Sequence, residues 1–127
     1  MEFKRNIIDC YIVSSTPKDM NSPLVIRSRY NEKEFIYTVL HELIHTMFAD
    51  NFFKQPKEFG KHSKTTINHI VLFALIEKYY LEVVEDKEFL EKIKEISNSE
   101  VNKEYKKAWD IVEEKGYQDI IKTAITN

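Results

Sequence analysis

The strongest pattern in this sequence is a run of apolar residues spaced as on one face of an α-helix. Between Glu32 and about Asp50 these residues recur every three or four positions: Phe35, Ile36, Val39, Leu40, Leu43, Ile44, Met47 and Phe48. The spacing matches the 3.6-residue period of an α-helix, so the segment predicts an amphipathic helix that buries one face. Asn31 is a favourable N-cap residue, and Glu34 follows it at the spacing of a capping box.

Two segments before this helix are typical of β-strands. Asn6 to Val13 is rich in β-branched and aromatic residues, which indicates a buried strand. Leu24 to Tyr30 alternates in polarity, which indicates a strand with one polar face. The stretch from Ser14 to Ser22 contains Pro17 and is a loop by composition. Two strands alone are marginally stable, so we expect the helix to pack on them.

The rest of the chain predicts further helices after a loop from Asn51 to Lys64. A second helix from Thr65 or Thr66 to about Glu85 is apolar nearly all round, so we expect it to be the central buried helix. Shorter amphipathic helices are expected at Glu88 to Ile96, at Val101 to Val112 with Gly116 closing it, and at Ile120 to Ile125. The expected fold class is therefore α+β and helix-rich, with a small N-terminal β-sheet packed on the first helix and helices at the C-terminal end.

Composition narrows the class of protein further. Lys and Arg number 19 against 21 Asp and Glu, a net charge of -2, which argues against nucleic acid and anionic membrane as partners. The longest apolar run, Ile70 to Ile76, is much shorter than the roughly 20 residues that span a bilayer. The single cysteine, Cys10, excludes an internal disulfide and fits a reducing compartment. We therefore expect a soluble cytoplasmic protein with no membrane partner. The sequence does not determine its oligomeric state.

Residues 41 to 45 read His-Glu-Leu-Ile-His inside the first predicted helix. At about 100° per residue, His41 and His45 lie roughly 40° apart around the helix, so both imidazoles project from one face and can share a metal ion. Zinc suits this donor set because it is borderline-soft and tetrahedral. Glu42 lies too far around the helix axis to bind the same ion but can reach a water molecule on the metal. The alternative is a surface helix with two hydrogen-bonded histidines and an ion-paired glutamate.

The His41-Glu42-x-x-His45 helix, preceded by a strand, resembles the active-site helix of the zincin zinc metallopeptidases. The motif covers five residues, and the strand and helix extend the resemblance to about thirty. It implies Zn²⁺ as the cofactor and an edge strand that binds substrate backbone, for which Leu24 to Tyr30 is the match by order along the chain. Phe48 and Asn51 stand where metzincins have glycine and a third histidine, which excludes that subgroup.

Three downstream residues are candidates for a third ligand. His69 resembles the downstream histidine of compact zincins such as the SprT-like proteases, and its surroundings resemble small HExxH proteins of archaea, viruses and phages. Glu77 would match the gluzincin arrangement, or else pair with a cation such as Lys78. His62 lies in a loop among lysines. The resemblance favours His69, which makes His41, His45 and His69 the expected metal ligands, while the other two alternatives stay open.

The expected function is zinc-dependent hydrolysis of peptide bonds in a peptide or protein substrate, with Glu42 as general base and acid. The alternative is a non-catalytic zincin-like zinc-binding module with a structural or protein-interaction role. We expect one domain over residues 1–127, with the metal-site core in residues 1–85. Residues 86–127 would then form a helical cover that makes the full-length peptidase latent.

Two weaker signals surround this motif. Lys54, Lys57, Lys61 and Lys64 predict a basic loop, for which solvation is the simpler interpretation and attraction of acidic peptide or nucleic acid the alternative. Four tyrosines are candidates for an oxyanion donor, as in some zincins, or else for packing: Tyr79, Tyr80, Tyr105 and Tyr117.

Overall fold

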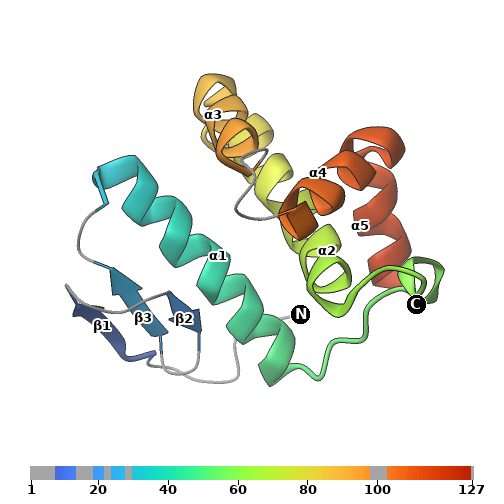
Figure 1. Cartoon of the computed structure of the whole chain (residues 1–127), viewed down its shortest axis with the longest axis horizontal. Helices are drawn as coiled ribbons and strands as arrows, with labels where there is room; N and C mark the ends of the chain where they lie inside the picture. Colours follow the sequence, from blue (N-terminus) through green and yellow to red (C-terminus); the bar gives the residue numbers. More distant parts are fainter. Residues whose placement is uncertain (1–7, 14–18, 22–23, 28–29, 98–102, 127) are drawn as a thin grey trace. The chain divides into compact units, whose positions relative to one another are not determined.

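The computed structural model describes residues 8–13, 19–21, 24–27, 30–97 and 103–126 of the chain. These residues form five α-helices and a small sheet, which confirms the helix-rich α+β class. The chain divides into two compact units, residues 1–53 and residues 54–127. The sheet and the first helix belong to the first unit, and the other four α-helices belong to the second (Figure 1).

The first unit contains a three-stranded sheet. β1 (Cys10–Val13) runs parallel to β3 (Leu24–Arg27), and β2 (Met20–Asn21) pairs with β3 in the antiparallel direction. Both predicted strands are confirmed, although each is shorter than expected, and residues 6–7 and 28–29 lie outside the described residues. The loop predicted between them is wrong where β2 forms, because a strand of two residues is too short to show an alternating pattern.

The order of the strands contradicts two expectations. The order β1-β3-β2 puts β3 in the centre of the described sheet, so the edge position expected for Leu24 to Tyr30 is wrong. β1 lies at an edge, and its Tyr11 and Ile12 are 54% and 59% exposed, so it is not the buried strand that its composition indicated. Leu24 and Ile26 of β3 are buried instead. A run of β-branched residues fits either position. It indicates extended backbone but does not indicate which segments pair with the strand.

α1 (Glu32–Asp50) has the bounds that the apolar spacing predicts. The side-chain oxygen of Asn31 accepts a hydrogen bond from the Glu34 backbone N–H at 2.9 Å, and the Asn31 amide donates to the Glu34 carboxylate. α1 packs on β2 and β3 and buries Ile44 and Phe48 (Figure 1). The motif at residues 41–45 therefore lies on a long capped helix that is anchored to the sheet.

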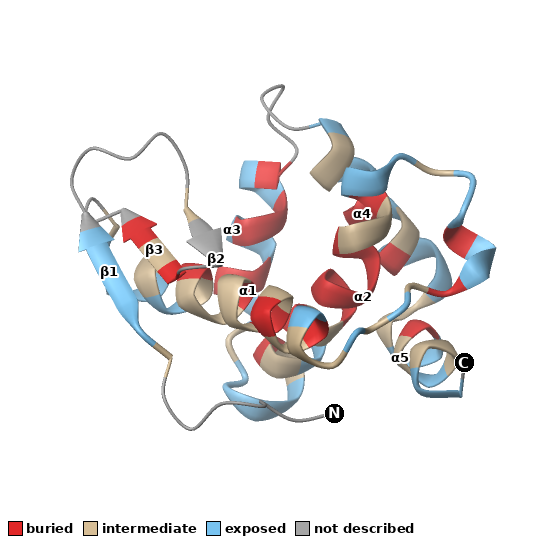
Figure 2. Cartoon of the chain, turned by 90° about the horizontal axis from the view of Figure 1, so that it is seen from below, coloured by how far each residue is buried: buried red, intermediate tan, exposed pale blue. Residues whose placement is uncertain are grey.

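The second unit is built around α2 (Lys64–Lys78). Its N-cap is Ser63, whose side chain accepts a hydrogen bond from the Thr66 N–H at 3.2 Å. The residues from Ile70 to Ile76 are buried apart from Leu75, which confirms the central buried helix (Figure 2). α2 begins one residue before the predicted start at Thr65, because Ser63 provides the cap.

The predicted continuation of this helix to Glu85 changes in type at Tyr79. Tyr79–Val83 forms a π-helix, and Glu85 has a φ of 54°. The Asp86 N–H donates to the Tyr80 carbonyl at 2.9 Å, and the Asp86 carboxylate accepts from the Phe89 N–H at 3.1 Å, which starts the next helix. The prediction of one α-helix is therefore wrong over the last turn, because the spacing of apolar residues there does not distinguish an α-turn from a π-turn.

Three more helices complete the second unit, and their predicted positions are confirmed over the described residues. They are α3 (Lys87–Ser97), α4 (Lys103–Lys115) and α5 (Tyr117–Thr126). Gly116 separates the last two with a φ of 83°, and its N–H donates to the Val112 carbonyl at 2.8 Å, as expected of a C′ glycine. No helix among the described residues is long and apolar enough to cross a bilayer.

The last helices supply much of the core of the second unit. The ring of Trp109 stacks on Phe73 of α2, with centroids 4.4 Å apart and planes 6° apart. Ala108 and Val112 of α4 and Ile120 of α5 are also buried, and both helices pack on α2. Two of the helices expected as a cover, α4 and α5, are therefore packing partners of α2. Their role in covering a site stays a prediction.

Candidate metal centre

His41 and His45 lie one turn apart on α1 with their rings close together. Their Nε2 atoms are 3.2 Å apart and their ring centroids are 5.0 Å apart. His41 is buried, and His45 is partly exposed. The i, i+4 spacing places both imidazoles on one helix face, which is what the sequence predicts.

The separation of these two nitrogen atoms suits a shared metal ion. Two nitrogen donors that are each about 2.0–2.1 Å from a tetrahedral zinc ion are about 3.3 Å from each other. The observed Nε2–Nε2 distance of 3.2 Å is close to this value. The pair on α1 therefore already has the geometry of two ligands on one ion.

Tyr37, one turn before His41, contacts the other side of its ring. The Tyr37 hydroxyl oxygen is 3.5 Å from Nδ1 of His41, and the two rings meet edge to face. In metal sites the second ring nitrogen of a ligand histidine usually donates to an oxygen atom, which fixes the tautomer. Because Tyr37 contacts Nδ1, the nitrogen of His41 that faces His45 is Nε2.

Glu42 lies beside the face of α1 that carries the two histidines. Its carbonyl accepts a hydrogen bond from the Thr46 hydroxyl at 3.1 Å, and its side chain is partly exposed. Successive helical residues are about 100° apart, so its carboxylate leaves the helix away from the shared face of the two histidines. The role of Glu42 in proton transfer stays a prediction.

His69 is buried on α2, and its ring is held by hydrogen bonding and by aromatic contacts. Its Nδ1 is 2.7 Å from the Thr65 carbonyl oxygen and must donate, because a carbonyl only accepts. The imidazole lies against Tyr105 and Phe73, with centroid distances of 4.3 Å and 5.4 Å. Burial lowers the pKa of His69, and the bond to Thr65 only partly opposes this. The ring is therefore neutral at pH 7, as a metal ligand must be.

The three histidines named from the sequence belong to two units, His41 and His45 to the first and His69 to the second. Each offers an imidazole nitrogen as a possible ligand atom. Three imidazoles suit several divalent ions, so this donor set does not identify the metal.

The other two candidate ligands, Glu77 and His62, both lie in the second unit. Glu77 accepts a hydrogen bond from Lys94 at 2.9 Å, and both side chains are largely buried. The ion-pair interpretation of Glu77 therefore gains support, but with Lys94 as the partner. Lys78 pairs with Glu82 at 3.1 Å instead. His62 is partly exposed in the segment before α2.

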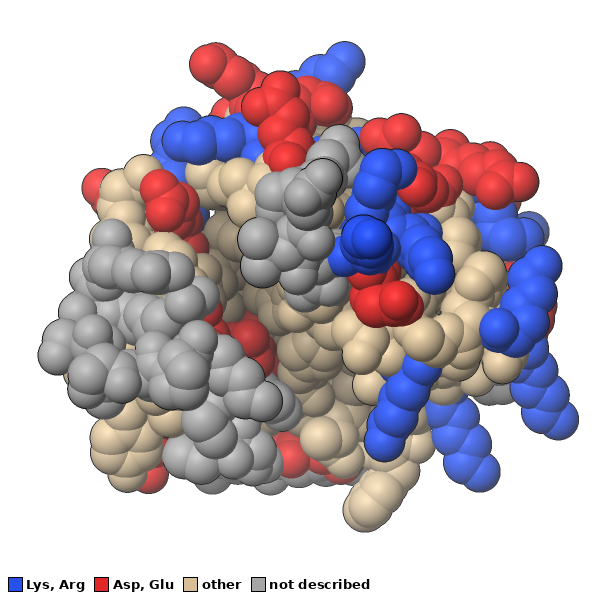
Figure 3. All heavy atoms as spheres, viewed as in Figure 1, with Lys and Arg blue, Asp and Glu red and all other residues tan. Residues whose placement is uncertain are grey.

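The basic loop is exposed at all four of its lysines, Lys54, Lys57, Lys61 and Lys64. On the face of the molecule in Figure 3, side chains of both charge signs are visible over the helices of the second unit. This mixture agrees with the near-zero net charge of the sequence. It supports the interpretation of the loop as a solvated surface.

The four candidate tyrosines have different surroundings. Tyr105 contacts His69 through its ring. Tyr80 is buried against Phe89, and burial together with the charges of Tyr79 and Asp86 raises the pKa of Tyr80 to about 12.

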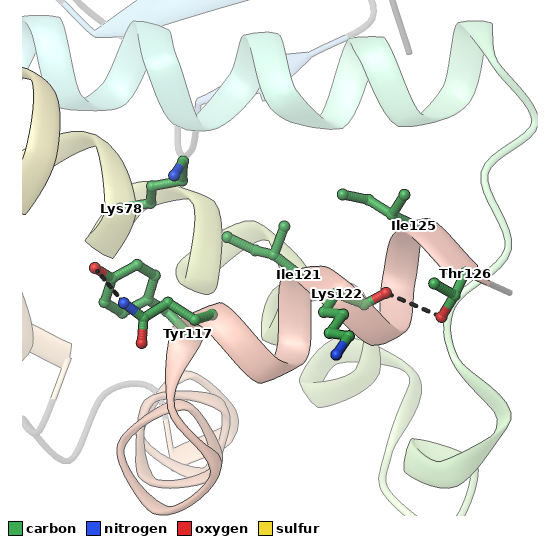
Figure 4. A pocket seen from close by; sticks show the side chains of 7 residues that line it. Lys78, Tyr117, Ile121, Lys122, Ile125 and Thr126 are labelled. Carbon is green, nitrogen blue, oxygen red and sulfur yellow. Dashed lines mark hydrogen bonds between the residues drawn. The ribbon is translucent and has the colours of Figure 1, made fainter.

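Tyr117 lines a pocket of about 290 Å³ that is formed by the end of α2 and by α5 (Figure 4). The other lining residues are Lys78, Gln118, Ile121, Lys122, Ile125 and Thr126, and none of the three histidines is among them.

Sequence reasoning missed the groups that orient the histidines. Tyr37 and the Thr65 carbonyl each lie four residues before the histidine that they contact. That spacing is the signal that could have found them, since residues four apart are neighbours on a helix.

Comparison of the chain with protein-family models, curated proteins and solved structures finds no match.

Proposed function

We propose that this protein is a zinc-dependent peptidase in which His41, His45 and His69 hold the ion and Glu42 transfers protons. The observation that carries the proposal is the pair on α1, whose Nε2 atoms are 3.2 Å apart with a glutamate beside them in the helix. The imidazole of His69, which is buried and donates through Nδ1 to the Thr65 carbonyl, supports it as the third ligand named from the sequence. Three histidines with a fourth position open to water are a known ligand set for catalytic zinc.

When bound, zinc supplies a Lewis acid that lowers the pKa of a coordinated water from about 16 to about 7. The three imidazoles would hold the ion through their ring nitrogens, with Nδ1 of His69 donating to the Thr65 carbonyl. The Glu42 carboxylate would accept the proton of the attacking water and return it to the leaving amine nitrogen. A proton carrier of this kind is a neighbour of the ligands without being one of them, which is the role proposed for Glu42 next to His41.

The Glu42→Gln variant tests the proposal, because the amide keeps the shape of the side chain but cannot accept a proton. We expect equal zinc content and a loss of at least about a hundredfold in the cleavage of a mixture of unstructured peptides, since general base catalysis contributes about 10²- to 10⁴-fold. Cleavage would be followed by mass spectrometry on zinc-reloaded protein. Glu32→Gln is the matched control, because Glu32 is an exposed residue in the first turn of the same helix.

One outcome would contradict the role of Glu42, and another would contradict the peptidase activity itself. Equal cleavage by the Glu42→Gln variant and the wild type would remove Glu42 from the reaction. Tight zinc binding without any cleavage by the wild type would instead support the non-catalytic zinc-binding module. Zinc content in the His41→Ala, His45→Ala and His69→Ala variants tests the ligand set separately from the reaction.

A further inference from the structure

The ring of Tyr105 on α4 lies against the imidazole of His69 on α2. The centroids are 4.3 Å apart, and the planes are inclined by 40°. Phe73, one turn after His69, touches both rings, at 5.4 Å from His69 and 5.5 Å from Tyr105. The imidazole therefore shares an aromatic cluster with residues from two helices of the second unit.

The position of Tyr105 relative to His69 is fixed by contacts on both sides of it. Glu104, the preceding residue, accepts hydrogen bonds from the hydroxyls of Ser63, the N-cap of α2, and of Thr66 in its first turn. One turn after Tyr105, Trp109 stacks on Phe73. The segment of α4 that carries Tyr105 is thus attached to α2 before and after His69.

These contacts restrict the rotations that aim the imidazole. The hydrogen bond from Nδ1 to the Thr65 carbonyl fixes one edge of the ring, and rotation of the ring about its own bond would drive it into Tyr105. A ligand held in one rotamer before the metal arrives loses less conformational entropy on binding. We propose that Tyr105 is a positioning residue that holds the ring of His69 in the orientation needed to present Nε2 to the metal.

This inference rests on the proposed metal site and adds the last third of the chain to it. Tyr105 differs from a core residue in its burial, because its side chain is partly exposed whereas Trp109 on the same helix is 2% exposed. We therefore expect replacement of Tyr105 by alanine to weaken metal binding more than it lowers the free energy of unfolding. Tyr117 on α5 is a matched control, since it is a partly exposed tyrosine of the same unit.

The experiment is a double-mutant cycle on zinc affinity, measured in the full chain by competition with a chromophoric chelator. Tyr105→Ala should weaken zinc binding by about 10- to 100-fold, the usual effect of removing a group that orients a ligand. Tyr105→Phe keeps the ring and should stay within about threefold of wild type, as should Tyr117→Ala. In the His69→Ala background, Tyr105→Ala should have no further effect, because it acts through His69.

A second measurement on the metal-free chain tests the ring contact itself. The ring protons of His69 should show nuclear Overhauser effects to Tyr105 and a ring-current shift, retained in Tyr105→Phe and lost in Tyr105→Ala. Thermal unfolding of each variant reports on the fold.

The outcomes separate the two proposals. If His69→Ala binds zinc like the wild type, the proposed ligand set fails and the role of Tyr105 fails with it. If His69→Ala weakens binding and Tyr105→Ala does not, only the positioning role is overturned. Equal weakening by Tyr105→Ala with and without His69 would also overturn it, because the effect would then be general.

Discussion

Lys94 is a charged side chain in the interior of the second unit. Its Nζ lies 2.9 Å from Glu77 of α2, 3.2 Å from Glu113 of α4 and 5.4 Å from the ring centroid of Trp109. Burial alone lowers the pKa of Lys94, but the hydrogen bonds and charges of Glu77 and Glu113 outweigh it and raise the pKa above its usual value. Lys94 therefore stays protonated and links α3 to both neighbouring helices.

Replacing Lys94 by Met removes the charge and keeps most of the stem. The carboxylate of Glu77, which is 13% exposed, would lose its partner. We expect the free energy of unfolding in urea to fall by about 2–3 kcal/mol, less than for a fully buried pair because some solvent reaches the site. The double variant Glu77→Gln/Lys94→Met should recover part of this loss. A similar loss in Lys92→Met, which alters an exposed residue of the same helix, would contradict the explanation.

Single residues could be predicted from the sequence where the deciding contact is local. The proximity of His41 and His45 follows from helical spacing, and so does the place of Glu42 beside them. The partner of Glu77 did not follow, because Lys94 lies 17 residues away and reaches it only through packing between helices. His69 could be named only through the resemblance, since no local rule connects it to α1.

The residue two positions after the end of α1 has an unusual backbone conformation for its type. Phe52 has a φ of 52° and is 88% exposed. Its N–H donates to the Ala49 carbonyl at 3.2 Å, and the Phe53 N–H donates to the Phe48 carbonyl at 2.9 Å, which is the Schellman pattern. Glycine usually occupies this place because other residues are strained at positive φ.

Phe52→Gly should therefore stabilise the protein. The change relieves the strain and removes no packing, and the greater freedom of glycine in the unfolded chain offsets only part of the gain. We expect a gain of about 0.5–1 kcal/mol in thermal or urea unfolding. Phe53→Ala should have the opposite sign, with a loss of about 1–2 kcal/mol, because Phe53 stacks on Phe48 at 4.4 Å. Destabilisation by Phe52→Gly would mean that the Phe52 ring makes a stabilising contact.

Elements could be predicted where periodicity and a cap agree. α1 combines an apolar stripe with Asn31, and its bounds were predicted correctly. β2 and the π-helix were missed because a two-residue strand and a one-residue change in helical period both fall below what a pattern of apolar residues can show. The central place of β3 was missed because strand order depends on contacts between segments.

The whole chain is divided into two compact units, with the boundary at residue 53. This boundary falls inside the segment 1–85 that the sequence pattern treats as one core. Apolar spacing identifies which faces are buried, but not which neighbours bury them. In the second unit the neighbours of α2 include α4 and α5, which lie in the last third of the chain.

A chain that ends after Ser97 should lose the fold of α2. Its buried residues, such as Ile70 and Phe73, pack in a unit to which α4 and α5 contribute Trp109, Val112 and Ile120. We expect amide hydrogen exchange between Ile70 and Ile76 to lose most of its protection in the shortened chain. Retained protection together with increased peptidase activity would instead support residues 86–127 as a removable cover.

The π-helix at Tyr79–Val83 makes this part of the chain intolerant of changes in length. Deleting one residue there would change the spacing that joins the Val84 N–H to the Tyr79 carbonyl and the Asp86 N–H to the Tyr80 carbonyl. The bond from Asp86 to Tyr80 would then lose its register, and with it the link between the π-helix and the residue that caps α3. A one-residue change in the exposed segment around Lys61 should be accommodated, because surface loops absorb insertions and deletions. Homologues of this protein should therefore vary in length before α2 and keep a constant length between α2 and α3.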